Sequence, residues 1–159
     1  MKIKINIPKL IFSIAICQLA GFIGSIFTSP SIPTWYASLN KPVFNPPSWI
    51  FAPVWTTLFF LMGVSLYLVW EKGLKEKKVK IALGFFSAQL LLNVLWSVIF
   101  FGLQQPLYAF IEIIILWTAI LLTILKFYKI SKPAAYLLMP YTLWVGFAAV
   151  LNYSLWMIN

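Results

Sequence analysis

Five long apolar stretches take up most of this sequence, and they restrict its fold more than any other feature. A helix needs about 20 consecutive apolar residues to cross the hydrocarbon core of a bilayer. Charged residues make up 9% of the 159 residues, whereas about 25% is usual in soluble domains. The sequence therefore predicts an all-α membrane protein: a bundle of five transmembrane helices, with residues 1–159 forming one domain. The predicted helices cover about residues 7–27, 46–70, 81–101, 107–128 and 134–158.

The connection between the first two predicted helices is the longest in the chain. Residues 28–45 are polar and rich in proline, so we expect a loop there. Pro46 and Pro47 suit the start of the second helix, where a missing N–H is not needed. Pro53 and Pro140 fall inside predicted helices, where each frees a carbonyl group and should bend its helix.

Lysine supplies the whole basic excess, which gives a net charge of +9. In a soluble protein this excess would suggest nucleic acid, but lysines beside membrane helices mark cytoplasmic loops and contact anionic lipid head groups. Lysine-rich and lysine-poor connections alternate, which predicts an N-terminus inside, a C-terminus outside and no nucleic-acid partner. The lysine-rich segments are the N-terminal tail (Lys2, Lys4, Lys9), the second loop (Lys72, Lys75, Lys77, Lys78, Lys80) and the fourth loop (Lys126, Lys129, Lys132).

Polar and aromatic residues recur on one face of three predicted helices. Spacings of three or four residues place side chains on the same helix face, and amides inside a membrane should face protein, water or a ligand. Two interpretations remain open: the stripes line a shared cavity for a flat, mostly apolar ligand, or they are interhelical packing. The stripes are Gln89, Asn93, Trp96 and Phe100; Trp144, Ala148 and Asn152; and Trp55, Phe59 and Met62.

Other residues also leave alternatives open. Glu112 lies about one turn inside the fourth predicted helix, where a carboxylate is a candidate proton carrier or partner for a cationic ligand. The simpler interpretation is that Glu112 is wetted at the outer interface or hydrogen-bonded to a neighbouring helix. Gly84 and Ala88 form a small-xxx-small pair, which predicts either a dimer seam or close packing within the bundle.

The sequence also lacks the usual catalytic groups. Histidine is absent, which removes the commonest metal ligand and the usual general base. Cys17 is the single cysteine, which excludes an intrachain disulfide. Because no catalytic triad or cluster of metal ligands is visible, we expect no metal site and no required cofactor.

The most specific motif runs from the first loop into the second helix. It contains Trp35-Tyr36, Lys41-Pro42, Pro46-Pro47 and Pro53-Val54-Trp55. The third helix adds Gln89, Asn93 and Trp96, and the fifth ends with Leu151-Asn152-Tyr153. From about Gly21 to the C-terminus the chain resembles the TspO/MBR family of bacterial tryptophan-rich sensory proteins and mitochondrial translocator proteins.

The resemblance implies a five-helix bundle, usually a homodimer, with a lid-like first loop over a pocket for porphyrins such as protoporphyrin IX. The expected function is a tetrapyrrole receptor or sensor in the cytoplasmic membrane of a prokaryote. Without histidine, metal-free porphyrin is favoured over haem as the ligand. The residues that match the family's pocket lining are Trp35, Tyr36, Trp55, Asn93, Trp96, Trp144, Ala148, Leu151 and Asn152.

Two other functions stay open beside the receptor. Some bacterial relatives are thought to break down protoporphyrin in light and oxygen, and the residues implicated correspond to Trp55 and Trp144, which would then be catalytic. Because the chain shows no preorganised acid, base or metal, the ligand itself would have to supply that chemistry. The remaining alternative is a small transporter of porphyrins or other apolar ligands, in which Glu112 is the candidate intramembrane charge.

Overall fold

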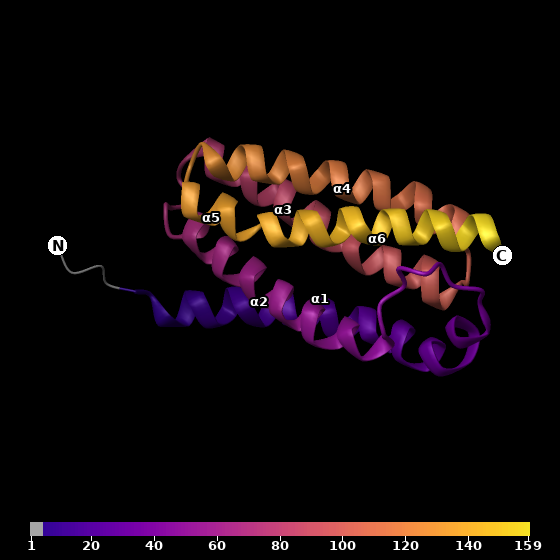
Figure 1. Ribbon diagram of the computed structural model, residues 1–159. Coiled ribbons are helices and arrows are strands. Elements are labelled where there is room, and N and C mark those ends of the chain that lie inside the picture. Colours follow the sequence, from indigo (N-terminus) through magenta and orange to yellow (C-terminus); the bar gives the residue numbers. More distant parts are fainter. Residues whose placement is uncertain (1–4) are drawn as a thin grey trace.

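The computed structural model describes residues 5–159 as a bundle of long helices (Figure 1). Within this range five helical segments are long and apolar enough to cross a membrane, and no strand is present. The prediction of an all-α membrane protein with five spans is confirmed. Lys2 and Lys4, which contributed to the predicted orientation, lie outside the described residues.

Short turns join the helices. The elements are α1 (Ile7–Ser31) with a π-helical turn (Ile32–Tyr36), a 3-10 turn (Ser48–Ile50) leading into α2 (Phe51–Trp70), α3 (Lys77–Ser97) with a second π-helical turn (Val98–Gly102), α4 (Pro106–Tyr128), α5 (Lys132–Leu137) and α6 (Met139–Ile158). The fifth span is therefore two helices, α5 and α6, in one membrane crossing.

The first helix is longer than the sequence indicated. The loop expected at residues 28–45 is wrong in its first part, because the chain stays helical through Tyr36. Side-chain hydroxyls hold this extension together: Thr34 Oγ1 donates to the Pro30 carbonyl at 2.8 Å, and Ser31 Oγ donates to the Phe101 carbonyl at 2.7 Å. In a membrane such bonds let a helix tolerate proline. Proline, serine and threonine were therefore misleading as loop signals here.

The prolines of the second and fifth spans also need correction. Helical structure in the second span begins at Ser48, with Pro47 as the preceding cap, and not at Pro46. Pro53 is the third residue of α2, which continues the 3-10 turn without a gap, and the bend at Pro53 stays a prediction. Pro140 stands in the first turn of α6, just after the break at Leu138, as expected of an interior proline.

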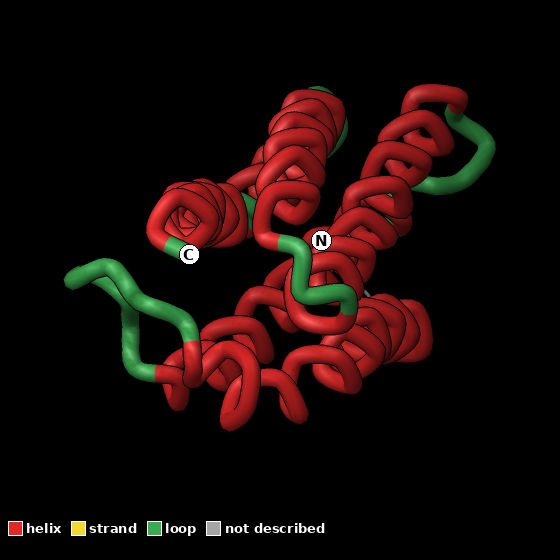
Figure 2. Tube along the Cα trace, turned by 90° about the vertical axis from the view of Figure 1, so that its right-hand side faces the viewer, coloured by secondary structure: helices red, strands yellow, loops and turns green. Residues whose placement is uncertain are grey.

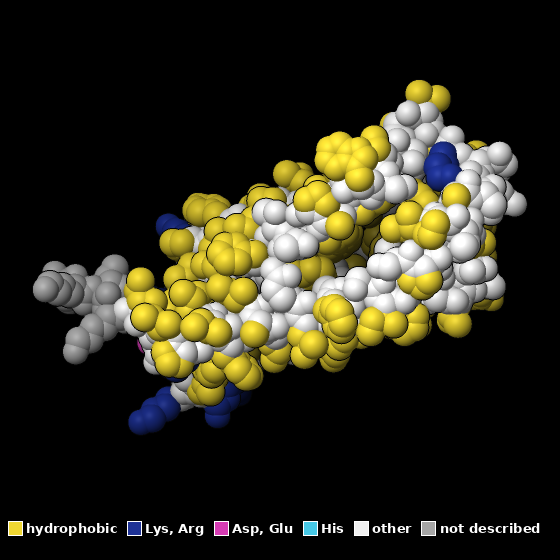
Figure 3. Space-filling model, turned by 90° about the horizontal axis from the view of Figure 1, so that it is seen from below, with side chains coloured by type: hydrophobic (Ala, Val, Ile, Leu, Met, Phe, Trp, Pro, Cys, Tyr) yellow, Lys and Arg dark blue, Asp and Glu magenta, His cyan; other side chains and the backbone are white. Residues whose placement is uncertain are grey.

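Two glycines bring α1 and α2 into close contact. A Cβ on Gly63 would lie 2.5 Å from the Ile14 Cα, and one on Gly21 would lie 2.6 Å from the Phe59 ring. Such distances are only possible without a side chain. Elsewhere α3 packs along α4, and α6 packs against α4. Large apolar side chains cover the outer faces of the bundle (Figure 3), as expected for contact with lipid.

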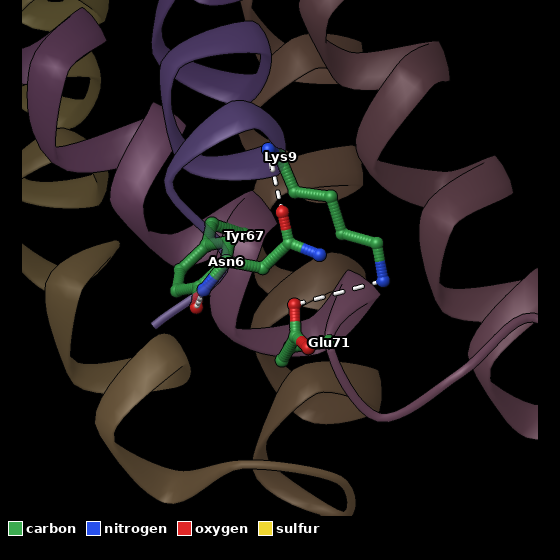
Figure 4. Close-up of polar contacts among 4 residues, drawn as sticks. All are labelled: Asn6, Lys9, Tyr67 and Glu71. Atoms are coloured by element: carbon green, nitrogen blue, oxygen red, sulfur yellow. Dashed lines mark hydrogen bonds and ion pairs between the residues drawn. The ribbon is translucent and has the colours of Figure 1, made fainter. Parts of the chain in front are cut away.

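Polar contacts close the end of the bundle that carries most of the described lysines. The Asn6 side chain caps α1 by accepting from the Lys9 backbone N–H at 3.2 Å, and the Asn6 N–H donates to the Tyr67 hydroxyl at 3.0 Å (Figure 4). Lys9 Nζ lies 3.6 Å from a carboxylate oxygen of Glu71 at the end of α2. These contacts fix the start of α1 against the end of α2.

Candidate functional site

A cavity of about 400 Å³ lies between α1, α2, α3 and α6, toward the end of the bundle that carries the first loop. Its lining contains no Lys, Asp or Glu side chain. The cavity reaches the surface beside α1 and α2, since exposed residues of both helices, such as Phe22 and Thr56, belong to its lining. Figure 3 shows this face, which is hollowed toward the loop end. The aromatic lining residues are Phe22, Tyr36, Phe51, Trp55, Phe59, Trp96, Phe100, Phe101 and Trp144.

Amide groups on the inner wall are fixed by neighbouring helices. The Asn93 amide nitrogen donates to the Tyr141 hydroxyl, which donates to the Gln89 amide oxygen, both at 2.9 Å. Trp96 Nε1 donates to the Asn152 amide oxygen at 3.1 Å, and the Asn152 nitrogen donates to the Pro106 carbonyl at 2.8 Å. The two interpretations of the stripes are therefore compatible: Asn93 and Asn152 connect helices and also line the cavity, whereas Gln89 only connects helices.

Trp144 contributes a hydrogen-bond donor without a partner among the described residues. Its Nε1 is buried, and its ring lies 5.4 Å from that of Phe147 and 6.3 Å from that of Phe51. A buried N–H left unpaired costs about 1–3 kcal/mol. The Trp144 side chain belongs to the cavity lining, so a ligand in the cavity would contact this residue.

Trp55 presents a second indole to the cavity from α2. Its ring centroid lies 5.6 Å from that of Phe59 at a tilt of 30° and 6.3 Å from that of Tyr141 in an edge-on arrangement. Such packing holds the ring in a fixed orientation. Trp55 and Trp144 thus line the same cavity from different helices.

Tyr36 connects the cavity to the loop. The Tyr36 ring is buried in the lining, and its hydroxyl lies 2.6 Å from the Asn45 amide oxygen. Lys41 Nζ lies 5.0 Å from the centre of the Tyr36 ring and donates to the carbonyls of Ala37 and Leu39. The position of Tyr36 is therefore coupled to the loop between Leu39 and Pro47.

The structure brings together all the predicted binding residues except Trp35. The Trp35 ring packs edge-on against the Phe100 ring, with 5.4 Å between their centroids, and does not line the cavity. It turns away because the segment that carries it is helical, so the adjacent Trp35 and Tyr36 side chains point in different directions.

The sequence analysis missed the contribution of α1. Gln18, Gly21, Ser25 and Thr28 line the cavity from this helix. Gln18 Nε2 donates to the Thr56 carbonyl of α2 at 3.0 Å. The spacing of these four residues puts polar and small groups on one helix face, and that pattern was a usable signal.

Glu112 and the Gly84–Ala88 pair lie outside the cavity. Glu112 is 6% exposed, and neither carboxylate oxygen has a hydrogen-bond partner among residues 5–159, so both simpler interpretations of Glu112 are wrong. The carboxylate lies on the buried face of α4, which Ala109, Ile113 and Leu116 share. Gly84 and Ala88 are exposed on α3, and a Cβ on Gly84 would meet nothing within 4 Å. Close packing within the bundle is therefore also wrong for this pair.

The sequence was compared with protein families and with individual proteins. Residues 13–157 match the TspO/MBR family. The chain is 48% identical over 155 residues to the tryptophan-rich protein TspO of Archaeoglobus fulgidus, covering 97% of this chain and 99% of that protein. It is 40% identical over 155 residues to the translocator protein of Homo sapiens (96% and 90% covered). It is 35% identical over 126 residues to the tryptophan-rich sensory protein of Cereibacter sphaeroides (79% and 77% covered).

Proposed function

The chain belongs to the TspO/MBR family, and from that premise we propose that it is a membrane receptor that binds a protoporphyrin IX-type tetrapyrrole in its aromatic cavity. The names of its relatives, translocator protein and tryptophan-rich sensory protein, support a receptor or sensor role in the membrane. The observation that carries the proposal is the aromatic cavity, which Trp55, Trp96 and Trp144 line from three helices.

The shape and chemistry of the cavity favour a flat, largely apolar ligand. Its volume falls within the range of about 300–1,000 Å³ found for small-molecule pockets. Its opening beside α1 and α2 lets part of a larger ring extend toward the lipid. Aromatic walls stack on conjugated rings, and no charged side chain lines this cavity. No separate cofactor is part of this proposal.

The test is a titration of the purified protein with protoporphyrin IX in the dark, followed by quenching of tryptophan emission. Trp144→Phe should weaken binding by about 0.5–1.5 kcal/mol, or roughly two- to tenfold in Kd, because a smaller ring stacks less well on the ligand. Asn93→Ala should weaken it as well. Trp117→Phe is the matched control, since the Trp117 N–H donates to the Thr142 carbonyl outside the cavity. Quenching that does not saturate, or that all three variants share, would contradict the proposal.

Light-driven breakdown of the porphyrin is a second candidate. It is favoured by one observation: Trp55 and Trp144 both line the cavity, so a bound ring would contact two oxidisable indoles. The excited porphyrin would pass its energy or an electron to dissolved oxygen, and the indoles would be the catalytic residues. We expect Trp55→Phe and Trp144→Phe to slow loss of the porphyrin absorbance under light more than they weaken dark binding. Equal rates in the variants and in protein-free micelles would exclude this function.

The same cavity gives little support to a proton-coupled transporter. Glu112 does not line it, so a ligand in the cavity would not meet the carboxylate. For the assembly we propose a homodimer with Gly84 and Ala88 at its seam, since both lie exposed on the outer face of α3.

A further inference from the structure

The loop between Leu39 and Pro47, together with the 3-10 turn that follows, exposes an unusual amount of apolar surface. Val43 is 106% exposed, Trp49 is 73% exposed and Phe44 is 48% exposed. Val43 and Phe44 lie outside the membrane helices, where exposed side chains of this size usually mark a surface that binds something, and Trp49 stands at the very start of the second span. Because this segment joins α1 to α2, it lies at the level where the helices leave the membrane.

Several contacts hold the base of this loop in place. The Asn40 backbone N–H donates to the Asn159 amide oxygen at 2.8 Å, and the Asn159 amide nitrogen donates to the Asn40 carbonyl at 3.0 Å. The Phe44 ring lies 6.3 Å from that of Phe147 on α6. The loop therefore passes beside α6 in a fixed position, and its apolar tip is presented by the fold.

The tip projects sideways beyond the helices. In Figure 2, which looks at the loop end of the bundle, the loop extends past the C-terminal end of α6, away from the other helices. Figure 3 shows hydrophobic side chains on this projecting part. Because the bundle is surrounded by lipid, a segment that extends past its perimeter at this level lies over lipid head groups.

The charge and aromatic pattern fit the same location. Lys41 is the one charged side chain between Leu39 and Phe51, and its Nζ is turned back onto the carbonyls of Ala37 and Leu39. Val43, Phe44 and Trp49 carry no charge, so Lys41 is the one cation beside them. Exposed aromatic residues at the same end of α4 and α6, namely Tyr108, Tyr153 and Trp156, mark the usual position of an interfacial aromatic belt.

We propose that Val43, Phe44 and Trp49 form a docking surface for the lipid bilayer. Their side chains insert at the boundary between head groups and acyl chains, where apolar groups of amphipathic segments reach about 5–10 Å deep. The membrane thereby holds the loop that carries Asn45, whose side chain contacts Tyr36 at the cavity. This inference does not depend on which ligand the cavity binds.

The test is the membrane depth of a nitroxide label at Val43→Cys in the full-length protein reconstituted into lipid nanodiscs. The native Cys17 is fully buried, and labelling of the unaltered protein measures any background. Leu143→Cys, on the lipid-facing side of α6, serves as the lipid reference, and Lys75→Cys in the α2–α3 connection serves as the water reference. The spin relaxation rate of each nitroxide is measured in the presence of oxygen, which concentrates in lipid. It is measured again in the presence of a water-soluble nickel chelate.

Docking predicts that the Val43 label responds to oxygen more than the Lys75 label but less than the Leu143 label, which lies deeper in the fifth span, and is shielded from nickel relative to the Lys75 label. A response to nickel equal to that of Lys75 would mean that the loop lies in water, and the proposal would be wrong. Protection from both reagents would mean that protein, such as a second copy of the chain, covers the tip, and this result would also overturn it.

A second measurement avoids any change at the tip of the loop. Lipids with brominated acyl chains quench nearby tryptophan emission, and the part due to Trp49 is the difference between the unaltered protein and Trp49→Phe. Docking predicts that this part is quenched strongly by bromine near the head groups. An unquenched Trp49 contribution would contradict the proposal even if the labelled protein folded poorly.

Discussion

Among single side chains, Glu112 has the least favourable surroundings. Both of its carboxylate oxygens are buried without a partner among the described residues, and a polar group buried in this way costs about 1–3 kcal/mol. We therefore expect Glu112→Leu, which keeps a similar volume, to raise the thermal unfolding temperature in detergent. Glu76→Leu at an exposed position should change it little.

Glu112→Gln separates stability from function at the same site. It should leave porphyrin binding in the dark unchanged, because the carboxylate does not line the cavity. If Glu112→Leu instead lowered the unfolding temperature and weakened binding, the carboxylate would have a partner beyond this single chain. The sequence could place Glu112 inside a span, but its burial depends on which way α4 faces, and that is decided by packing.

Gly63 gives a second prediction at the scale of one residue. Because a Cβ there would lie 2.5 Å from the backbone of Ile14, Gly63→Ala must push α1 away from α2. Overpacking of this kind typically costs about 1–3 kcal/mol, so the unfolding temperature should fall. Gly146→Ala in α6 is the matched control, since a Cβ there would make only an ordinary contact, 3.4 Å from Trp117 Nε1, and alanine favours the helix. Equal stability of the two variants would show that α1 and α2 are less closely packed than described.

At the scale of helices, hydrophobic length identified all five spans, because each must cross the same hydrocarbon thickness. The ends of the helices were harder to predict. Pro30 lies inside α1, and Ser31 and Thr34 stabilise the segment around it through carbonyls that only the folded structure supplies. Pro53 lies near the start of α2, and the bend expected there stays a prediction. A proline shows where an N–H is missing and not whether the helix needs it.

The exposed small residues of α3 lead to a prediction about assembly. Gly84 and Ala88 leave a shallow surface on which a second helix can approach closely. Replacing both with leucine should shift a dimer toward monomers in mild detergent, measured by light scattering on a sizing column, while porphyrin binding persists. Thr118→Leu on the exposed face of α4 is the control and should not change the molar mass. A dimer that survives the double substitution would place the seam elsewhere.

For the molecule as a whole, the cavity could be predicted in part. Stripes on three helices identified Trp55, Asn93, Trp96, Trp144 and Asn152, because period and polarity show which helix faces avoid lipid. The stripe of Gln18, Gly21, Ser25 and Thr28 on α1 has the same kind of spacing and was overlooked, although small and polar residues on a membrane helix also serve packing. Which stripes face one another depends on how the helices are arranged. The residues of a single stripe carry no information on that arrangement.

The charge distribution of the whole cavity decides how an acidic porphyrin can bind. No lysine lines the cavity, and a carboxylate buried without a partner is strongly unfavourable. A dicarboxylic porphyrin with both acid groups on one edge can therefore insert its apolar edge and leave the carboxylates at the opening, where water or head groups solvate them. Its dimethyl ester should then bind within about fivefold of the acid, because an exposed ion pair is worth at most about 1 kcal/mol.

A porphyrin with carboxylates on every edge provides the contrast, because any orientation in the cavity would bury a charge. It should bind at least about tenfold more weakly than the dicarboxylic acid. The measurement is Kd in the dark, in lipid nanodiscs, with empty nanodiscs subtracted to remove partitioning. Lys41 is the cation nearest to the Tyr36 wall, and Lys41→Gln should leave the affinity for the dicarboxylic acid within the same fivefold. If the ester bound far more weakly than the acid and Lys41→Gln reproduced that loss, the ligand would instead be held by its carboxylates beneath the loop.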